Sequence, residues 1–500
     1  MTRSQRLVLL ASILGSFVAF LDASVVNVAL PAIQKNLGGG ISAQQWIVDA
    51  YLVTLGSFIL LAGSLSDLFG RKRVFAVGLI GFGLTSLLAA IAPGAGVLIG
   101  ARALQGVTGA LLVPSSLAII VANFTGAEQG KAIGTWTAWT GISFIVGPLL
   151  GGALVDIGSW RWVFAINVAP IALTLAVLAR IPAEAPRSER SHVDLPGAIL
   201  CALGLGGIIF GLIEEPHHGW RAPGIYLPLG GGAGAFAAFL IYERFARHPM
   251  LDFKLFKRRN FAVGNAATAA IYAGLSVFTF LLPMFLQQVA GYTATEAGGA
   301  MVPVTALMFA LSPVAGRLAA KQGPRWFMTF GPLVAAGGFL LLMLLVTARA
   351  AYFTEMLPGV LVFGVGLSFT VSPLTAAILG GIDQRQAGIG SAINNAISRV
   401  AGLLAVAAVG AIVAARFSAA LAPADEAALG ARARVFVTEA RSRPLDTSVP
   451  GDLGREGPAV KVMLQGASVG ALRTALWSMA GLLAAGGLIS AAGIRNPKQS

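Results

Sequence analysis

The chain is 500 residues long, and 56% of its residues are hydrophobic while only 11% are charged. Soluble proteins carry about 25% charged residues, so this composition and a mean hydropathy of +0.80 exclude a soluble enzyme with a simple anchor and indicate a polytopic membrane protein. The net charge of +14 is not clustered, which argues against a nucleic-acid partner, and the single cysteine, Cys201, excludes a disulfide within the chain.

Apolar runs long enough to cross a bilayer, about 20 residues each, follow one another along the chain. They lie near 7–31, 46–66, 74–93, 97–122, 132–155, 160–180, 195–214, 223–242, 260–288, 297–319, 326–347, 353–380, 387–415 and 467–492. The first run lacks a small-residue cleavage site, so we expect a retained span and not a signal peptide. The sequence therefore predicts an all-α fold with fourteen transmembrane helices.

The positive charges orient these spans. If both termini are cytoplasmic, well over half of the 35 Lys and Arg residues fall in cytoplasmic segments, whereas the short outer loops hold only Lys35, Arg161, Arg221 and Arg349. An even number of spans and cytoplasmic termini follow. The high Ala, Gly and Arg content favours the inner membrane of a bacterial cell.

A charged segment at 63–73, predicted to be a loop, is partly repeated later in the chain. Its pattern of Gly63, Asp67, Gly70 and Arg71 returns at one constant offset as Gly316, Ala320, Gly323 and Pro324. Repeated halves in an apolar chain are typical of secondary transporters. This offset makes the second span equivalent to the tenth, so the seventh and eighth spans are extra to the two repeated halves. The three predicted regions are an N-terminal six-helix bundle (1–181), two inserted helices with cytoplasmic connectors (182–258), and a C-terminal six-helix bundle (259–500). The last region has a long outer loop at about 416–466, in which a short helix is expected near 424–440.

Four stretches carry a family resemblance. They are Gly63–Arg73, Leu21–Pro31, Arg102–Gly106 with Gly109, and Ser143–Gly152, in which Ser143 replaces a usual glycine. Together they resemble the signature motifs of the major facilitator superfamily, specifically its fourteen-span drug:proton antiporter branch. The resemblance implies a major-facilitator fold with two six-helix bundles plus two inserted helices. It also implies that the fifth-span motif Gly147, Pro148, Gly151 and Gly152 seals the transport path and marks an exporter.

Asp22 is the leading candidate for proton coupling. It lies about fifteen residues into the first span, which at 1.5 Å per residue places it deep in the membrane. Insertion of a carboxylate at that depth costs at least ~2.5 kcal/mol. Arg102 in the fourth span lies at a depth that differs from that of Asp22 by roughly 6 Å. Burial favours protonated Asp22 whereas a nearby arginine favours the ionised form, as a proton carrier requires. A purely structural ion pair remains the alternative; the resemblance implies that Arg102 assists proton transfer.

Asp49 begins the second span, close to the outer surface. The favoured interpretation is an interfacial, water-facing aspartate. The alternative is a second protonation or cation-contact site.

The segment at 63–73 is the candidate conformational gate, with Gly63, Asp67, Gly70, Arg71 and Arg73. The resemblance implies that Asp67 engages the opposite half near Gln386–Gly390 when the cytoplasmic entrance is closed. In the second copy Ala320 replaces the acid, so only the first copy keeps the charge.

Polar and aromatic residues within the spans are candidates for a substrate cavity, although aromatic residues in spans mostly pack or face lipid. They are Asn27, Trp46, Trp136, Trp139, Phe144, Gln288, Asn394, Asn395 and Arg399. Arg399 has no evident acidic partner in the C-terminal spans, and a structural role is favoured for it.

These observations predict a proton-coupled exporter of amphipathic or cationic organic compounds that works by alternating access. Its expected partners are a small-molecule substrate, protons and the lipid bilayer; no cofactor, metal site or nucleic acid is expected, and the protein is expected to be a monomer. An exporter of a lipid, siderophore or other metabolite is the alternative, and a channel or non-transporting receptor is a third. No motif for an enzyme is recognised.

Overall fold

The computed structural model describes residues 1–124, 126–181, 194–247, 249, 251, 253–380, 382, 387–421, 429–441 and 443–496. Within these ranges every regular element is helical, as the sequence predicts. The chain forms two compact units, and each is described by itself. Unit 1 comprises Met1–Gly38, Trp46–Ile208 and Gly230–Asp252; unit 2 comprises Gly39–Gln45, Ile209–Leu229 and Phe253–Ser500.

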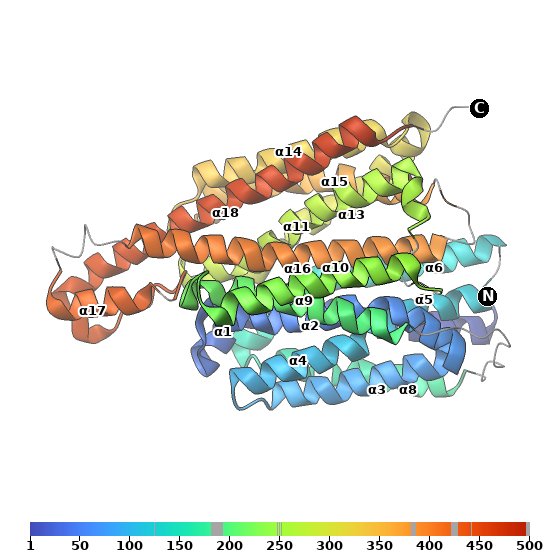
Figure 1. Cartoon of the computed structure of the whole chain (residues 1–500), viewed down its shortest axis with the longest axis horizontal. Coiled ribbons are helices and arrows are strands. Elements are labelled where there is room, and N and C mark those ends of the chain that lie inside the picture. Colours follow the sequence, from blue (N-terminus) through green and yellow to red (C-terminus); the bar gives the residue numbers. More distant parts are fainter. Residues whose placement is uncertain are drawn as a thin grey trace. The chain divides into compact units, whose positions relative to one another are not determined.

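Unit 1 contains the N-terminal helices and parts of two further helices (Figure 1). In chain order the helices are α1 (Arg3–Leu37), α2 (Gly40–Phe69), α3 (Arg71–Ala90), α4 (Ala95–Ala110), α5 (Leu112–Asn123), α6 (Gly126–Ile157), α7 (Trp162–Ala165), α8 (Val168–Ala179), α9 (Leu195–His218) and α10 (Pro223–Phe245). The predicted fourth span is two helices, α4 and α5, joined at Leu111, and the predicted sixth span is α7 followed by α8. Both breaks retain near-helical dihedral angles, so each pair still crosses as one segment.

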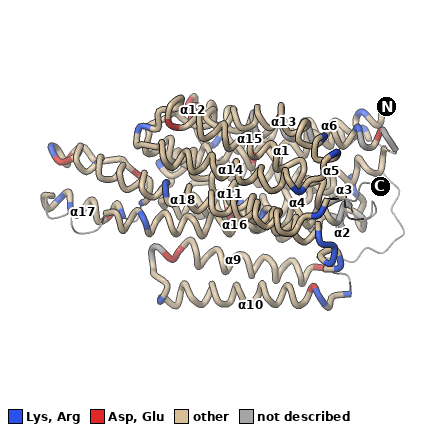
Figure 2. The backbone as a smooth tube through the Cα atoms, turned by 90° about the horizontal axis from the view of Figure 1, so that it is seen from above, with Lys and Arg blue, Asp and Glu red and all other residues tan. Residues whose placement is uncertain are grey.

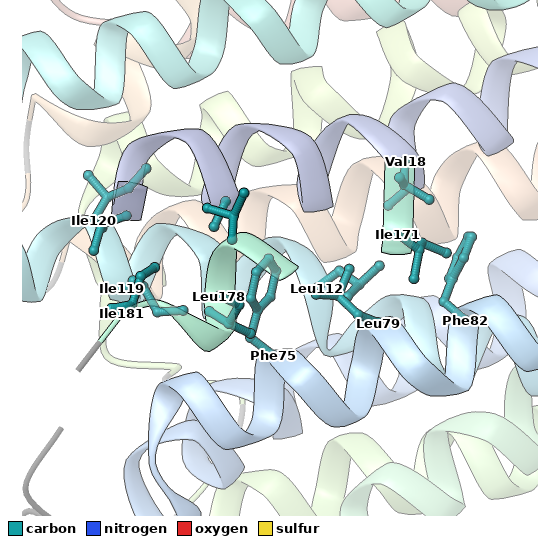
Figure 3. Packing of buried hydrophobic residues seen from close by; sticks show 14 of the residues in the cluster. Val18, Phe75, Leu79, Phe82, Leu112, Ile119, Ile120, Ile171, Leu178 and Ile181 are labelled. Atoms are coloured by element: carbon teal, nitrogen blue, oxygen red, sulfur yellow. The ribbon is translucent and has the colours of Figure 1, made fainter. Parts of the chain in front are cut away.

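The core of unit 1 lies between α1, α3, α5 and α8. Figure 3 shows Val18 of α1, Phe75 and Leu79 of α3, Leu112 of α5 and Ile171 of α8 packed together. Small residues allow this contact, because association of helices in lipid depends on close van der Waals packing. A Cβ atom on Gly15 of α1 would lie 2.3 Å from the Phe75 ring.

The remaining helices belong to unit 2. They are η1 (Leu255–Lys257), α11 (Arg259–Gln288), α12 (Ala294–Gly299), α13 (Val302–Gln322), α14 (Arg325–Leu345), η2 (Tyr352–Met356), α15 (Leu357–Leu379), α16 (Ala387–Ala420), α17 (Ala431–Ala440), η5 (Gly451–Glu456) and α18 (Gly457–Gly493). Phe278 of α11, Phe339 of α14 and Phe363 of α15 form an aromatic cluster with ring centroids 4.6–5.1 Å apart. This cluster joins three helices from separate parts of the sequence.

The outer segment between α16 and α18 is partly helical. The expected short helix is present as α17, and α18 begins at Gly457, earlier than the predicted start at 467. With 37 residues, α18 is longer than the roughly 20 residues that a bilayer requires. Hydropathy alone missed its first turns because they are more polar than the rest.

The turn between α2 and α3 is a single residue. Gly70, with φ 89° and ψ 130°, separates Phe69, which ends α2, from Arg71, which begins α3. The predicted loop at 63–73 is therefore wrong, since the residues before Gly70 form the last turns of α2. Gly323, with φ 86° and ψ 153°, has a similar conformation after α13, and Pro324 follows it before α14 begins at Arg325. Because only glycine adopts such angles without strain, the repeat in sequence corresponds to a repeat in backbone geometry.

Twelve helical segments within the described residues are long and apolar enough to cross a membrane. The long helices α2 and α6 are not among these twelve, and both include positions whose side chains lie outside the described part. Figure 2 shows that the acidic and basic residues of α9 and α10 gather at the helix ends, as expected for spanning helices. The three predicted regions, 1–181, 182–258 and 259–500, stay predictions.

Candidate functional site

Asp22 lies at the centre of a buried polar network in unit 1. Its side chain on α1 is 0% exposed, and Oδ2 accepts a hydrogen bond from Nη1 of Arg102 on α4 at 2.5 Å. Arg102 is 1% exposed. The depths estimated from the sequence put the two residues within reach of each other, and in the structure they form an ion pair.

Arg102 has acceptors besides Asp22. Its Nε donates to the carbonyl oxygen of Ile47 on α2 at 3.0 Å, and Nη1 also donates to Oε1 of Gln105 at 2.8 Å. The guanidinium carbon lies 4.3 Å from the centroid of the Tyr51 ring, a cation–π contact. The guanidinium thus keeps partners even when Asp22 carries no charge.

Asp22 also accepts two amide hydrogen bonds through Oδ1. Nε2 of Gln105 lies 3.0 Å away and Nδ2 of Asn167 lies 2.9 Å away. Both amides also donate to Oγ of Ser86, at 2.8 and 3.3 Å. All of these side chains are buried.

Ser86, Asn167 and Tyr51 belong to this site although no sequence motif predicts them. Gln105 lies within the motif Arg102–Gly106, and its position one turn after Arg102 places both side chains on one helix face. Asn167 is a polar residue within an apolar run, and polar side chains inside a membrane need partners. That signal was present, but the partner could not be read from it.

Glycines of α6 bring that helix against α1 beside Asp22. A Cβ atom on Gly147 would lie 1.9 Å from Oγ of Ser24, and one on Gly151 would lie 2.3 Å from Cγ2 of Val25. The Ser24 hydroxyl group donates to the carbonyl oxygen of Ser143 on α6 at 3.1 Å. The fifth-span motif therefore packs directly on the turn of α1 that follows Asp22.

Gly106 brings α4 against α2. A Cβ atom on Gly106 would lie 2.1 Å from Oγ1 of Thr54 and 2.2 Å from the carbonyl oxygen of Tyr51. Oγ1 of Thr54 donates to the carbonyl oxygen of Ala103 at 2.7 Å. This contact fixes the position of Arg102, one turn before Gly106.

The Arg102 guanidinium keeps hydrogen-bond and ring contacts, although no counter-ion, when Asp22 is neutral. When Asp22 is ionised, Arg102 neutralises it and two amides bind it. When Asp22 is protonated, Arg102 retains Ile47, Gln105 and the Tyr51 ring. An uncompensated buried charge costs several kcal/mol. These alternative partners therefore reduce the difference in free energy between the two protonation states.

Asp49 is completely buried on α2, so the interpretation as a water-facing aspartate is wrong. Within the described part of the chain, neither Oδ1 nor Oδ2 accepts a hydrogen bond. A buried, unsolvated carboxylate is costly in its charged form. Asp49 therefore differs from Asp22, which accepts three hydrogen bonds.

Two cations of the α2–α3 turn bind backbone carbonyl groups in unit 1. Nη1 of Arg71 donates to the carbonyl oxygen of Ala118 on α5 at 3.0 Å, and Nζ of Lys72 donates to the carbonyl oxygen of Ile181. Arg73 is exposed. The side chains of Asp67 and of the predicted segment 386–389 lie outside the described residues, as does any detail of Gly63, so the contact expected for Asp67 stays a prediction.

The cavity candidates have different surroundings. Nε1 of Trp136 donates to Oγ of Ser16 at 3.1 Å, Trp139 is 53% exposed, and Asn395 is exposed with its amide bound to the carbonyl oxygen of Ser391. Asn27 and Trp46 are half-buried, and Oδ1 of Asn27 has no hydrogen-bond partner in the described chain. The side chain of Phe144 lies outside the described residues.

The remaining candidates belong to unit 2. Nδ2 of Asn394 on α16 donates to Oδ1 of Asn265 and Oγ1 of Thr268 on α11, at 3.0 and 2.8 Å. Gln288 and Arg399 are half-buried. Asn394 thus connects two helices of this unit.

The chain matches the Major Facilitator Superfamily over residues 12–406, and it belongs to that family. It is therefore a transporter with many membrane-spanning helices and not an enzyme.

Two relatives of the chain carry names that refer to drug resistance. The chain is 34% identical to the multidrug resistance protein Stp of Mycobacterium tuberculosis over 430 residues, which cover 86% of this chain and 80% of Stp. It is 35% identical to the puromycin resistance protein pur8 of Streptomyces alboniger over 391 residues, 77% of each chain. Both names describe resistance to drugs.

The fold is also shared with solved transporters. A bacterial homologue of the human lysosomal transporter Spinster, in an inward-facing and unoccupied conformation, superposes with a TM-score of 0.68 at 16% identity, covering 99% of this chain and 100% of that one. At this identity the similarity shows the fold alone.

Proposed function

We propose that the protein is a proton-coupled exporter, an antiporter of amphipathic or cationic organic compounds, in the fourteen-span drug:proton antiporter branch. The observation that carries the proposal is the buried network around Asp22, which holds a carboxylate, a guanidinium and two amide donors together within unit 1. The drug-resistance names of the relatives support the export of drugs.

Asp22 is the proposed proton carrier, and Arg102 is its proposed positioning partner. Protonation of Asp22 breaks the ion pair, and Arg102 then relies on Ile47, Gln105 and Tyr51. Each proton that crosses the membrane supplies about 2.3 kcal/mol per 100 mV of potential. The gradient therefore suffices for uphill export without a cofactor.

Asp49 is proposed as a second protonation or cation-contact site. Its carboxyl group is buried and accepts no hydrogen bond among the described residues. Such a group is stable either as the neutral acid or beside a cation, and a cationic substrate would supply that charge. We expect Asp49→Asn to weaken export of cationic compounds about 10-fold or more, since hydrogen bonds and pairs to charges contribute about 1.5–3 kcal/mol, while neutral compounds are still exported.

Alternating access is proposed to use the close packing of α6 against α1. Gly147 and Gly151 couple α6 to the turn of α1 beside Asp22, so a change at the carboxyl group can be transmitted to the fifth-span motif with Pro148 and Gly152. The gate is proposed at Gly63, Asp67, Gly70, Arg71 and Arg73. Asn27, Trp46, Trp136, Trp139, Phe144, Gln288, Asn394, Asn395 and Arg399 remain the proposed substrate contacts.

The proposed topology has fourteen spans, in which α2 and α6 join the twelve segments described above, with both termini in the cytoplasm. The proposed location is the bacterial inner membrane, and the proposed state is a monomer. Accessibility labelling of single cysteines, placed at Arg73 and Lys35 in a Cys201→Ser background, tests this orientation. Labelling of both positions from the same side of the membrane would contradict it.

The test of coupling is drug efflux from proteoliposomes with imposed pH steps. Wild-type protein is expected to move a cationic dye against its gradient only when a proton gradient is present, and Asp22→Asn is expected to abolish this flux. Thr85→Ala, which removes a hydroxyl group that donates only to carbonyl oxygens of its own helix among the described residues, is the matched control. Undiminished coupling in Asp22→Asn would overturn the proposal. A parallel panel of lipids, siderophores and neutral drugs tests the alternative cargoes, because one fold can serve several.

A further inference from the structure

An apolar groove lies between the first turns of α14 and the middle of α15 in unit 2, and we call it the α14–α15 groove. Its volume is about 240 Å³. Its walls are mainly aromatic, with Trp326, Phe327 and Phe330 on α14 and Phe369 on α15. Both helices are long and apolar enough to cross a membrane, so an apolar groove between them is available to lipid.

One wall of the groove is a row of side chains along α14. Trp326, Phe330 and Val334 recur at every fourth residue and therefore lie on one face of the helix. At 1.5 Å per residue this row is roughly 12 Å long. The rings of Trp326 and Phe330 stack with centroids 5.7 Å apart, and both side chains are 56% exposed. The row therefore presents a continuous apolar surface outside the protein core.

The floor of the groove is made by two glycines at which the helices touch. A Cβ atom on Gly331 would lie 2.5 Å from Oγ1 of Thr370, and one on Gly366 would lie 2.2 Å from the backbone nitrogen of Ala335. Backbone meets backbone here, so side chains cannot fill the floor. The groove is therefore a consequence of close helix packing.

Positive charge lies at one end of the groove. Arg325 is the first residue of α14, and its guanidinium carbon lies 5.7 Å from the centroid of the Trp326 ring. Arg317 and Lys321 lie in the last two turns of α13, just before the turn at Gly323. All three cations are exposed.

The surrounding helices offer these cations no acid. Helices α13, α14, α15 and α18 contain no Asp or Glu, and Ala320 stands where the first copy of the repeat has its acid. The side chains of Arg317 and Arg325 donate to the carbonyl oxygens of Pro313 and Ala491 and form no ion pair within the described part of the chain. The charge at this end of the groove is thus complementary to an anion from outside the helices.

We propose that the α14–α15 groove binds an anionic phospholipid, with an acyl chain along the aromatic row and the phosphate group at Arg325. Basic residues at a membrane surface attract anionic headgroups, and tryptophan is favoured at the boundary between headgroups and chains. Which leaflet supplies the lipid, the cytoplasmic one, rests on the topology proposed above; the binding does not.

A cationic drug fits this groove less well than the lipid does. The same cations that attract a phosphate group repel a positively charged compound. The volume of the groove is also below the roughly 300–1,000 Å³ of typical sites for drug-sized ligands, whereas a single acyl chain is narrow. The groove is therefore separate from the substrate contacts proposed above.

The test titrates purified full-length protein in detergent micelles with phosphatidylglycerol or phosphatidylcholine of identical acyl chains, and native mass spectrometry measures the bound lipid. Wild-type protein is expected to bind phosphatidylglycerol at least about 10-fold more tightly, because each cation near the headgroup contributes on the order of fivefold. Arg325→Gln should lose about fivefold of this affinity, and Arg325→Lys should retain most of it. Arg432→Gln, which removes an exposed cation from α17, is the control and should match the wild type.

A second variant tests the groove without changing its charge. Val334→Trp fills the groove and should weaken binding of phosphatidylglycerol at least about 10-fold. Leu344→Trp is the control, because Leu344 is 69% exposed on the same helix and lies outside the groove. Asp22→Asn should bind the lipid as the wild type does, so a failure of proton-coupled export and a failure of lipid binding are separate results.

Three results would overturn the proposal. One is equal affinity of the wild type for the two lipids, and another is undiminished binding of phosphatidylglycerol in Val334→Trp. The third is displacement of the bound lipid by a cationic dye whose own binding Val334→Trp weakens, because the groove would then hold the transported compound.

Discussion

Arg102 binds Asp22 through Nη1 while its Nε binds the carbonyl oxygen of Ile47. A single guanidinium on α4 therefore joins α1 and α2, and the protonation state of Asp22 acts on both contacts. Tyr51, one turn after Ile47, covers the guanidinium face.

The energetic coupling between Asp22 and Arg102 is measurable by a double-mutant cycle. Asp22→Asn leaves a buried guanidinium without its counter-ion, and Arg102→Gln leaves a buried carboxylate with amide donors only, so each should destabilise the protein by about 3–5 kcal/mol at most. The free energy of unfolding of the double variant should exceed the value expected from the sum of the two single losses by about 1–3 kcal/mol. Unfolding in mixed micelles gives these free energies. As a control, Asp22→Asn combined with Arg317→Gln, which lies on α13 in the other unit, should be additive; additivity in the Arg102 cycle would contradict a direct pair.

Asn167→Ala should move the pH dependence of export. The amide of Asn167 donates to the ionised form of Asp22, so its removal favours the protonated form. We expect the pH at half-maximal efflux to rise by on the order of 1 unit, as measured by dye efflux from proteoliposomes at stepped internal pH. Asn123→Ala removes an amide that binds only the carbonyl oxygen of Ile119 on its own helix and should leave the profile unchanged. An unchanged profile in Asn167→Ala would show that Asp22 does not carry the coupled proton.

Gly147→Val should impair transport by separating α6 from α1. Even a Cβ atom at this position would lie 1.9 Å from Oγ of Ser24, and overpacking of this kind costs about 1–3 kcal/mol. We expect a lower melting temperature and at least a 10-fold loss of efflux. Gly134→Val on the same helix, where a Cβ atom would meet open space, is the matched control. Equal activity of the two variants would show that close packing at the fifth-span motif is not required.

Gly70→Ala and Gly323→Ala test the repeated turn. Each glycine has a φ near +90°, and a side chain there costs about 1–3 kcal/mol in backbone strain. The loss should be larger at Gly323, because a Cβ atom there would also lie 2.2 Å from the side chain of Asn496, whereas open space surrounds Gly70. Thermal unfolding measures both. Gly94→Ala, with an extended φ of −157° and open space, should be neutral, and equal stability of all three variants would rule out strain at the turns.

The sequence by itself determined the class of protein. Apolar runs of spanning length require helices, because backbone groups in lipid must bond within their own segment. The matched offset of Gly70 and Gly323 correctly predicted equivalent turns, since both positions demand a backbone that only glycine adopts freely. The depth of Asp22 and Arg102 in their spans predicted contact range between the two side chains, because rise along a helix is fixed.

Only the tertiary structure decided which side chains meet. Rotation of each helix about its axis depends on packing against neighbours, and small residues such as Gly106 and Gly147 set that packing at positions that hydropathy cannot distinguish. Asn167 and Ser86 therefore joined Asp22 without a signal of partnership in the sequence. For the same reason Asp49, expected to face water, is buried. Asp194 and Glu243 are far apart in the sequence, yet a Cβ atom on Gly197 would lie within 3 Å of a carboxyl oxygen of each.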